Sequence, residues 1–269
     1  MKNYILIPYD YDEALFNSFG FDEFILPLAN YSIGFEYYFS IFEINELAKK
    51  YKINVLINKF LHKKDIEDIK NIINNLNNVN LFFIEDLGLT GIIPKNKIVI
   101  FQNHIINNYE SINYLNENGF DKVVVSNELT NEELKVISSK TKSQLYYFIF
   151  NRNMLMYSKR KLVSNYLDYY SYDLKTKTLL VKEKVSQYDL FIKEENDGTT
   201  IFDGKIYSLL NERNKLPLKN IIINLNNINS EEKKEVLNNY RDKVNIETNN
   251  YFYLNKINYK VKKWKHVKY

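Results

Sequence analysis

Residues 122–150 read KVVVSNELTNEELKVISSKTKSQLYYFIF, and this stretch decides the fold. It opens with a β-branched run, residues 122–125, which predicts a strand. Thr130 follows, with Glu133 three residues further on, and such a pair is the capping box of a helix start. An apolar and aromatic run at residues 145–150 predicts a second strand. A strand, a helix and a strand in this order indicate two parallel strands.

The same alternation of short apolar runs and amphipathic stretches runs along residues 1–150 and returns near the end of the chain. Eight strands with helices between them predict a TIM-like (β/α)8 barrel of the α/β class. A doubly wound open sheet is the alternative. Strands are predicted at residues 4–7, 24–28, 55–57, 81–84, 98–101, 122–125, 145–150 and 220–224, and helices at 41–51, 65–76, 109–118, 130–139 and 230–240.

The alternation breaks after residue 150. Residues 158–170 are predicted to be helical, although basic residues occupy the first turn, where the helix dipole disfavours them. Three short antiparallel strands are predicted at 178–182, 190–194 and 199–202, joined by turn residues. The predicted organisation is therefore seven βα units in 1–150, a helix-plus-antiparallel insertion in 151–217, the last βα unit in 218–250, and a basic-aromatic C-terminal tail in 251–269.

The composition excludes several classes of site. None of the 269 residues is cysteine, which excludes disulfides, cysteine nucleophiles, thiolate zinc sites and iron–sulfur clusters held by this chain. No glycine-rich phosphate loop, serine-hydrolase elbow or zinc-protease motif is present. No signal peptide or membrane-spanning run is present either, which predicts a cytoplasmic protein without membrane contact.

The net charge of +4 is unevenly distributed, because residues 251–269 contain six lysines and no acidic residue. Residues 1–250 therefore carry a net charge of −2. Since cations contact phosphates and aromatic rings stack on bases, the tail is predicted to bind RNA, with a solvated terminus as the alternative. The predicted RNA-binding residues are Lys260, Lys262, Lys263, Trp264 and Lys265.

In a barrel, the functional site lies at the carboxyl ends of the strands, and polar residues follow most of the predicted strands. The carboxylates, together with one histidine, are the candidates for acid–base catalysis or metal ligation, although their spacing identifies no metal. Asn and Asp also serve as routine turn and cap formers, which is the alternative for each of them. The catalytic candidates are Glu85, Asp86, His104 and Glu128; the substrate-binding candidates are Asn58, His62, Gln102, Asn103, Asn107, Ser126, Arg152, Ser158, Arg160 and Lys161.

Several of these residues lie in segments that resemble the peptidase U32 (collagenase-like protease) family. The segments occur in the family's order from about residue 23 to 225, and the blocks SNELT and SKRKL are the most specific. The resemblance implies a TIM-barrel-like core, in agreement with the strand count. The matching segments are VLINKFLH at 55–62, EDLG at 85–88, QNH at 102–104, VVVSNELTNEE at 123–133, YSKRKLVSNY at 157–166 and EENDGTTIF at 194–202.

The resemblance implies either proteolysis or hydroxylation of RNA bases or quinone precursors. Many hydroxylating members bind an iron–sulfur cluster through four cysteines, and some use prephenate as a co-substrate. This chain departs from that pattern, because it has no cysteine near residues 151–185.

We therefore expect a cluster-free subunit in tRNA uridine hydroxylation, acting alone, as a homodimer or with a Cys-bearing paralogue. Arg152, Arg160 and Lys161 would hold an anionic, prephenate-like co-substrate. A U32-type peptidase, which is a hydrolase, and a non-catalytic scaffold for a homologous enzyme are the alternatives. Dependence on a metal stays open.

Overall fold

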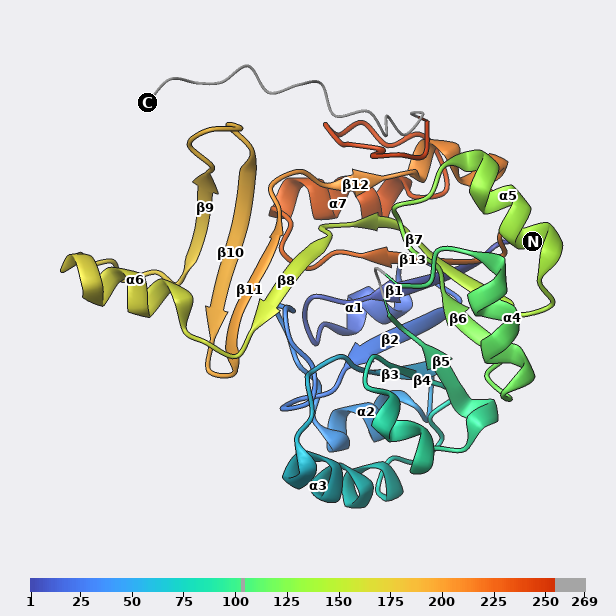
Figure 1. Cartoon of the computed structure of the whole chain (residues 1–269). Helices are drawn as coiled ribbons and strands as arrows, with labels where there is room; N and C mark the ends of the chain where they lie inside the picture. The colour runs from blue at the N-terminus through green and yellow to red at the C-terminus, as the bar shows by residue number, and fades with distance from the viewer. Residues whose placement is uncertain (103–104, 255–269) are drawn as a thin grey trace.

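The computed structural model describes residues 1–102 and 105–254. Eight parallel strands form a closed barrel, with helices between most successive strands (Figure 1). The barrel strands are β1 (Asn3–Ile7), β2 (Glu23–Pro27), β3 (Ile53–Ile57), β4 (Phe82–Ile84), β5 (Ile98–Ile100), β6 (Lys122–Val124), β7 (Gln144–Asn151) and β13 (Asn220–Asn224). Their order is β7-β13-β1-β2-β3-β4-β5-β6, and pairing of β6 with β7 closes the sheet. The predicted TIM-like barrel is confirmed, and the open sheet is excluded.

Two helices begin where their capping residues predict, whereas the helix predicted at 65–76 begins at Lys63. Ser40 and Thr130 each accept a hydrogen bond from the third helical residue, and a glutamate reciprocates in both boxes. Short 3-10 segments replace a helix between β4 and β5. The helices are α1 (Glu13–Asn17), α2 (Ile41–Leu47), α3 (Lys63–Asn74), α4 (Tyr109–Glu117), α5 (Asn131–Lys140) and α7 (Ser230–Asn239), and the 3-10 segments are η1 (Leu87–Gly91) and η2 (Lys95–Lys97). None of the described helices is long and apolar enough to cross a membrane.

The barrel strands are buried on both faces, as parallel strands in α/β proteins generally are. Ile5, Ile25, Phe83 and Phe148 belong to one buried cluster, which fills the barrel interior. Alternate residues of the same strands, such as Leu6, belong to a second cluster that packs against the helices. This two-sided burial explains why the strands appear in the sequence as continuous apolar runs.

The insertion between β7 and β13 is a separate antiparallel sheet with strand order β8-β11-β10-β9, and α6 packs against β11. Figure 1 shows this sheet and α6 projecting to one side of the barrel. The elements are β8 (Met154–Ser158), α6 (Leu162–Tyr170), β9 (Thr178–Lys182), β10 (Asp189–Glu195), β11 (Gly198–Asp203), β12 (Tyr207–Ser208) and η3 (Leu210–Lys215).

The predicted helix at 158–170 is wrong in its first turn, because α6 begins at Leu162. Ser158 instead ends β8 and pairs with Thr199 of β11. The pairing satisfies the backbone groups of these residues from a partner about forty positions away, a contact that helical periodicity does not reveal.

A buried polar network ties β1, β2 and β3 together at the amino-terminal end of the barrel. The Glu23 side chain is 3% exposed, and its carboxylate accepts hydrogen bonds from Asn3 Nδ2 at 2.9 Å and Asn54 Nδ2 at 3.0 Å. Lys52 forms an ion pair with the same group. Buried amide donors need such an acceptor, because leaving them unpaired costs their full desolvation free energy.

Replacing Glu23 with alanine should therefore lower the free energy of unfolding by about 1–3 kcal/mol, since the half-buried Asn3 amide and the buried Asn54 amide each lose one of two acceptors. Urea denaturation followed by circular dichroism measures the change. Glu67→Ala, at an exposed position of α3, is the matched control and should unfold like the wild type. Equal stability of the Glu23→Ala and Glu67→Ala variants would show that the network contributes nothing.

Candidate functional site

A cavity of about 300 Å³ lies where the carboxyl ends of β3 and β4 and the residue after β5 meet β8 of the insertion. We call it the mouth pocket. Its lining combines one carboxyl group with aromatic and apolar side chains, and Phe60 and Tyr157 form a ring pair with centroids 5.1 Å apart. The lining residues are Ile33, Asn58, Phe60, Glu85, Phe101, Met154, Leu155, Met156 and Tyr157.

Glu85 is the titratable carboxyl group of the mouth pocket. It follows β4 directly, and its backbone N–H donates to Ile57 O at 3.1 Å. Burial raises the pKa of the Glu85 carboxyl to about 7, and the neighbouring charge of Asp86 adds to the rise. Within residues 1–102 and 105–254, no side chain donates a hydrogen bond to this carboxyl group. A carboxyl that titrates near neutral pH can act as a general acid or base.

The adjacent Asp86 has different surroundings. Its Oδ1 accepts from Gly88 N at 2.8 Å, which caps η1, and its Oδ2 accepts from Leu61 N at 3.4 Å. Two successive residues at the end of a strand point to opposite sides. From the sequence both carboxylates are equal catalytic candidates. The structure places Glu85 in the pocket and Asp86 in the turns behind it.

Asn58 lines the mouth pocket and also holds its wall. Its side-chain amide is buried, accepts from Ile33 N at 3.0 Å and donates to Ile33 O at 3.3 Å. Gln102 Nε2 donates to Glu85 O at 3.3 Å. Both contacts fix the backbone around the pocket.

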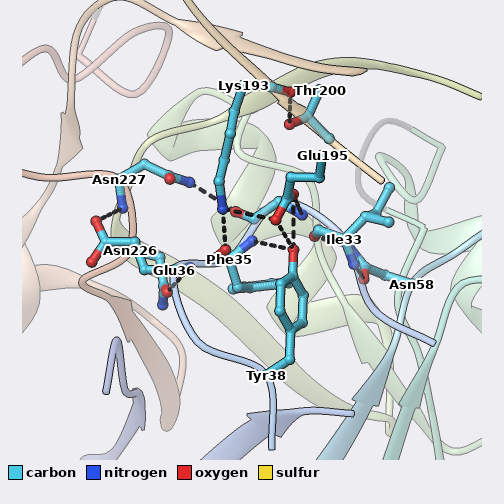
Figure 2. A network of polar contacts seen from close by, with 11 residues as sticks. Ile33, Phe35, Glu36, Tyr38, Asn58, Lys193, Glu195, Thr200, Asn226 and Asn227 are labelled. Carbon is cyan, nitrogen blue, oxygen red and sulfur yellow. Dashed lines mark hydrogen bonds and ion pairs between the residues drawn. The ribbon is translucent and has the colours of Figure 1, made fainter. Parts of the chain in front are cut away.

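The loop between β2 and α2 meets strand β10 in a polar network (Figure 2). The Tyr38 hydroxyl lies 2.9 Å from both carboxylate oxygens of Glu195 and accepts from Phe35 N at 3.1 Å. Burial, followed by the Glu195 charge, raises the pKa of Tyr38. Lys193 forms an ion pair with Glu195 at 3.0 Å and donates to Phe35 O. These contacts join the insertion to the barrel.

The same loop is held from the other side by residues after β13. Asn227 N donates to Glu36 Oε1 at 2.7 Å, and Asn227 Nδ2 donates to Gly34 O at 2.7 Å. Asn226 Oδ1 accepts from Glu36 N at 2.8 Å, and Lys233 pairs with the Glu36 carboxylate. Figure 2 shows Asn226 and Asn227 beside Glu36. The loop is therefore clamped between the last barrel strand and the insertion.

A second cavity, of about 330 Å³, adjoins the mouth pocket and shares Ile33 and Tyr157 with it. We call it the loop pocket; its lining includes Tyr38, Glu195 and Asp197. The Tyr157 hydroxyl donates to Asp197 O at 2.8 Å. Burial and the charge of Asp197 raise the pKa of Tyr157 to about 12. The hydroxyl therefore stays protonated at neutral pH and serves as a hydrogen-bond donor.

Other predicted site residues lie elsewhere. Ser126 and Glu128 line a cavity of about 240 Å³ near Asp203, where Ser126 Oγ accepts from Glu128 N at 3.1 Å. Arg152 donates to Asn227 O at 2.8 Å and to Asp203 O at 2.9 Å. A third bond joins its guanidinium to Gly204 O at 2.6 Å. Arg152 is thus engaged with backbone carbonyls that anchor the insertion.

The remaining candidates are at the surface or outside the described residues. His62 is the exposed N-cap residue of α3, and Asn107 is exposed beside Asn108. Arg160 and Lys161 are exposed in the connection from β8 to α6, and Ser158 is the last residue of β8. Asn103, His104, Lys260, Lys262, Lys263, Trp264 and Lys265 lie outside the described residues.

Sequence reasoning missed several residues of this region. Phe60 and Tyr157 stand inside segments that carry the family resemblance, so their place in those segments was an available signal. Tyr38 and Glu195 had no local signal, because 157 positions separate them. Among the described residues, no group of three or more His, Asp or Glu side chains is placed to hold a metal ion.

The barrel, with an antiparallel insertion over the carboxyl ends of its strands, defines the structural class, and sequence comparison defines the family. The family model of Peptidase family U32 matches residues 36–216, which is more than half of the chain. The chain belongs to peptidase family U32. A comparison with curated protein sequences returns no match.

Comparison with solved structures finds one that agrees with the fold and a second that is less similar. The U32 peptidase Mk0906 is similar with a TM-score of 0.51 and 10% identity, over 83% of this chain and 92% of that chain. The C-terminal domain of a candidate chitinase from Desulfitobacterium hafniense DCB-2 has a TM-score of 0.38 and 12% identity, over 83% and 93% of the two chains. At these identities the likeness to Mk0906 supports the fold alone.

The raised pKa of Glu85 should make stability depend on pH. The folded state holds the Glu85 proton up to about pH 7, whereas an unfolded glutamate loses it near pH 4.3. Stability from this group is therefore full below the unfolded pKa and declines as the pH rises through the folded pKa. The free energy of unfolding of the wild type, relative to Glu85→Gln, should fall between pH 5 and pH 8. A difference that stays constant across this interval would contradict the raised pKa.

Substitution of Gly34 tests how closely the clamped loop approaches the insertion. Its φ is +84°, and a Cβ there would lie 2.7 Å from Met154 Cε and 3.0 Å from Phe202 Cζ. Gly34→Ala should lower the free energy of unfolding by about 1–3 kcal/mol, because a side chain at positive φ is strained and also meets the insertion. Gly91→Ala is the control, since nothing lies within 4 Å of its Cβ position. Matching urea midpoints for the two variants would contradict the close approach.

Proposed function

We propose that this chain is a cluster-free subunit of an RNA-modification system that binds a uridine base in the mouth pocket. The observation that carries the proposal is the combination of aromatic walls with a carboxyl group whose pKa is about 7. Unpaired RNA bases are recognised by stacking on aromatic rings and by hydrogen bonds to their edges. Enzymes that act on a base take it into a pocket of this kind.

The chemistry of uracil fits the lining of the mouth pocket. The base has a flat face, for which Phe60, Phe101 and Tyr157 provide rings. Its edge alternates carbonyl acceptors with one N–H donor. A carboxyl group near its pKa is present in both protonation states, so Glu85 can donate to a carbonyl or accept from the N–H.

In this proposal the chain binds and orients the tRNA uridine, Glu85 serves as a general acid or base, and the redox group for hydroxylation comes from a Cys-bearing paralogue. A homodimer or a chain that acts alone is the other arrangement. Arg160 and Lys161 support the proposal of an anionic, prephenate-like co-substrate, because both cations are exposed. The Lys- and Trp-containing tail is proposed to add phosphate contacts. We place the reaction in the cytoplasm.

Peptidase activity is a second candidate, and the same Glu85 supports it. A carboxylate with a pKa of about 7 is suited to remove a proton from an attacking water. A non-catalytic scaffold for a homologous enzyme is the third arrangement. The family name alone does not decide among these functions, since one fold hosts many activities.

Nucleoside mass spectrometry of total tRNA from a deletion strain tests the proposal. We expect a hydroxylated uridine to disappear and the wild-type gene to restore it. Glu85→Gln should restore less than about one tenth of the modification, because a positioned acid–base group contributes roughly 10²–10⁴-fold in rate. Glu117→Gln, at the exposed end of α4, is the control and should restore it fully.

An unchanged nucleoside profile in the deletion strain would reject the RNA-modification proposal. Hydrolysis of gelatin by the purified chain, lost in Glu85→Gln, would then support the peptidase. Without hydrolysis, co-purification with a Cys-bearing U32 protein would support the scaffold.

A further inference from the structure

Four exposed tyrosines gather on α6 and the residue that follows its C-terminal turn. We call Tyr166, Tyr169, Tyr170 and Tyr172 the tyrosine cluster; their exposed fractions are 57%, 81%, 52% and 60%. The ring of Tyr170 lies 4.7 Å from that of Tyr166, 4.8 Å from Tyr169 and 6.1 Å from Tyr172, between centroids. Large rings exposed singly are ordinary, whereas a contiguous exposed patch marks an interaction site.

An apolar groove of about 510 Å³ adjoins the tyrosine cluster. Tyr166 and Tyr172 line it together with Leu162, Leu174 and Leu180. Figure 1 shows α6 and β9 on the side of the insertion remote from the barrel. The cluster and the groove therefore lie on the part of the insertion remote from the barrel, and we call them together the outer face.

The segment that carries this face is basic. Residues 159–184 contain seven Lys and Arg but only three Asp and Glu, whereas residues 1–250 together have a net charge of −2. Lysine is depleted at protein–protein interfaces, while Lys and Arg neutralise the phosphates of nucleic acids. Tyrosines among lysines fit a single-stranded nucleic acid better than a protein partner, because bases stack on rings while phosphates contact the cations.

The N-terminus of α6 is capped by the insertion sheet rather than by its own N-cap side chain, since Leu162 N donates to Thr199 Oγ1 at 2.9 Å and Ser164 N donates to Glu194 Oε2 at 3.0 Å. Lys161 occupies the N-cap position without a side-chain hydrogen bond to the helix, and Lys159 and Arg160 precede it. Asp, Asn, Ser and Thr are the stabilising residues at an N-cap, and cations near the positive end of the helix dipole are unfavourable. The three basic side chains are exposed and take no part in capping the helix, so they are available to an anionic ligand.

The basic segment lies between the outer face and the pockets. Thr199 Oγ1 donates to Arg160 O at 2.8 Å. A Cβ on Gly198 would lie 2.8 Å from Lys159 Cα, and Gly198 and Asp197 line the loop pocket. A strand bound on the outer face would pass residues 159–161 before it reaches the mouth pocket.

We infer that the tyrosine cluster, with the Lys and Arg residues of 159–184, is a binding surface for single-stranded RNA. Bases stack on the exposed rings and phosphates contact the cations. The identity of this RNA as the modified substrate rests on the proposed function; the existence of the surface does not.

Fluorescence anisotropy with a labelled oligouridine of about twelve nucleotides, within the usual site sizes, tests the surface. The double variant Tyr169→Ala/Tyr170→Ala should bind roughly tenfold more weakly or worse, since each stacked base contributes substantially. Tyr114→Ala is the control, because Tyr114 is 67% exposed on α4. Equal affinities of the double variant and the wild type would overturn the inference, as would a wild type that binds no RNA at low salt.

The variant Lys161→Asp distinguishes a loss of RNA contact from a loss of folded structure. Lys161 is exposed, and Thr199 and Glu194 already accept hydrogen bonds from the first N–H groups of α6, so the variant should keep the fold of the wild type. It should nevertheless bind the oligouridine more weakly, with a salt dependence reduced by about one phosphate contact. Unchanged affinity and salt dependence would reject the role of this cation.

A protein partner on the same face is an outcome that the experiments distinguish. If sedimentation velocity shows that the tyrosine double variant loses self-association while its RNA affinity is unchanged, the face is a subunit interface and the inference fails. The anisotropy does not depend on modification. Loss of the hydroxylated uridine in the deletion strain, together with unchanged RNA affinity of the double variant, would reject this surface and keep the proposed function.

Discussion

Pairing of β6 with β7 closes the sheet, and the candidate site depends on that closure. In a closed parallel barrel, the carboxyl ends of all strands meet at one rim. Asn58 and Glu85 follow different strands, yet both reach the same cavity. The insertion begins after β7 at this rim. Its first strand, β8, therefore lies across the mouth of the barrel. Closure of the barrel therefore positions both the strand ends that form the floor of the mouth pocket and the insertion that covers it.

The cover is held by polar groups that are nearly all paired. Lys193, Glu195 and Tyr38 satisfy one another where the β2 loop meets β10, and Arg152 joins carbonyls on both sides of the insertion. Partly buried charges are tolerable only with such partners, because desolvation opposes them. Glu85 contrasts with this network, since burial raises its pKa to about 7. Their pairing distinguishes the polar groups that stabilise the fold from Glu85, which is available for acid–base chemistry.

Membership of family U32 supports the fold of this chain but does not identify a reaction. The chain contains no cysteine, so it holds no cluster through thiolates of its own. Two parts of the insertion divide the binding work in our proposals. Strand β8 lines the mouth pocket, which receives a base, and the outer face offers rings and cations to a longer strand.

The sequence by itself determined the eight barrel strands and the capped helix starts, because apolar runs and capping boxes act over a few residues. Only the tertiary structure decided that residues 154–158 form a strand, since its partner β11 lies about forty positions away. The same holds for Glu85 and Asp86, neighbours in sequence that meet different surroundings. Burial and electrostatics depend on residues that folding brings together, so neither could be read from local pattern. The tyrosine cluster stands between these cases: its residues are adjacent in sequence, but their exposure was decided by how α6 packs on β11.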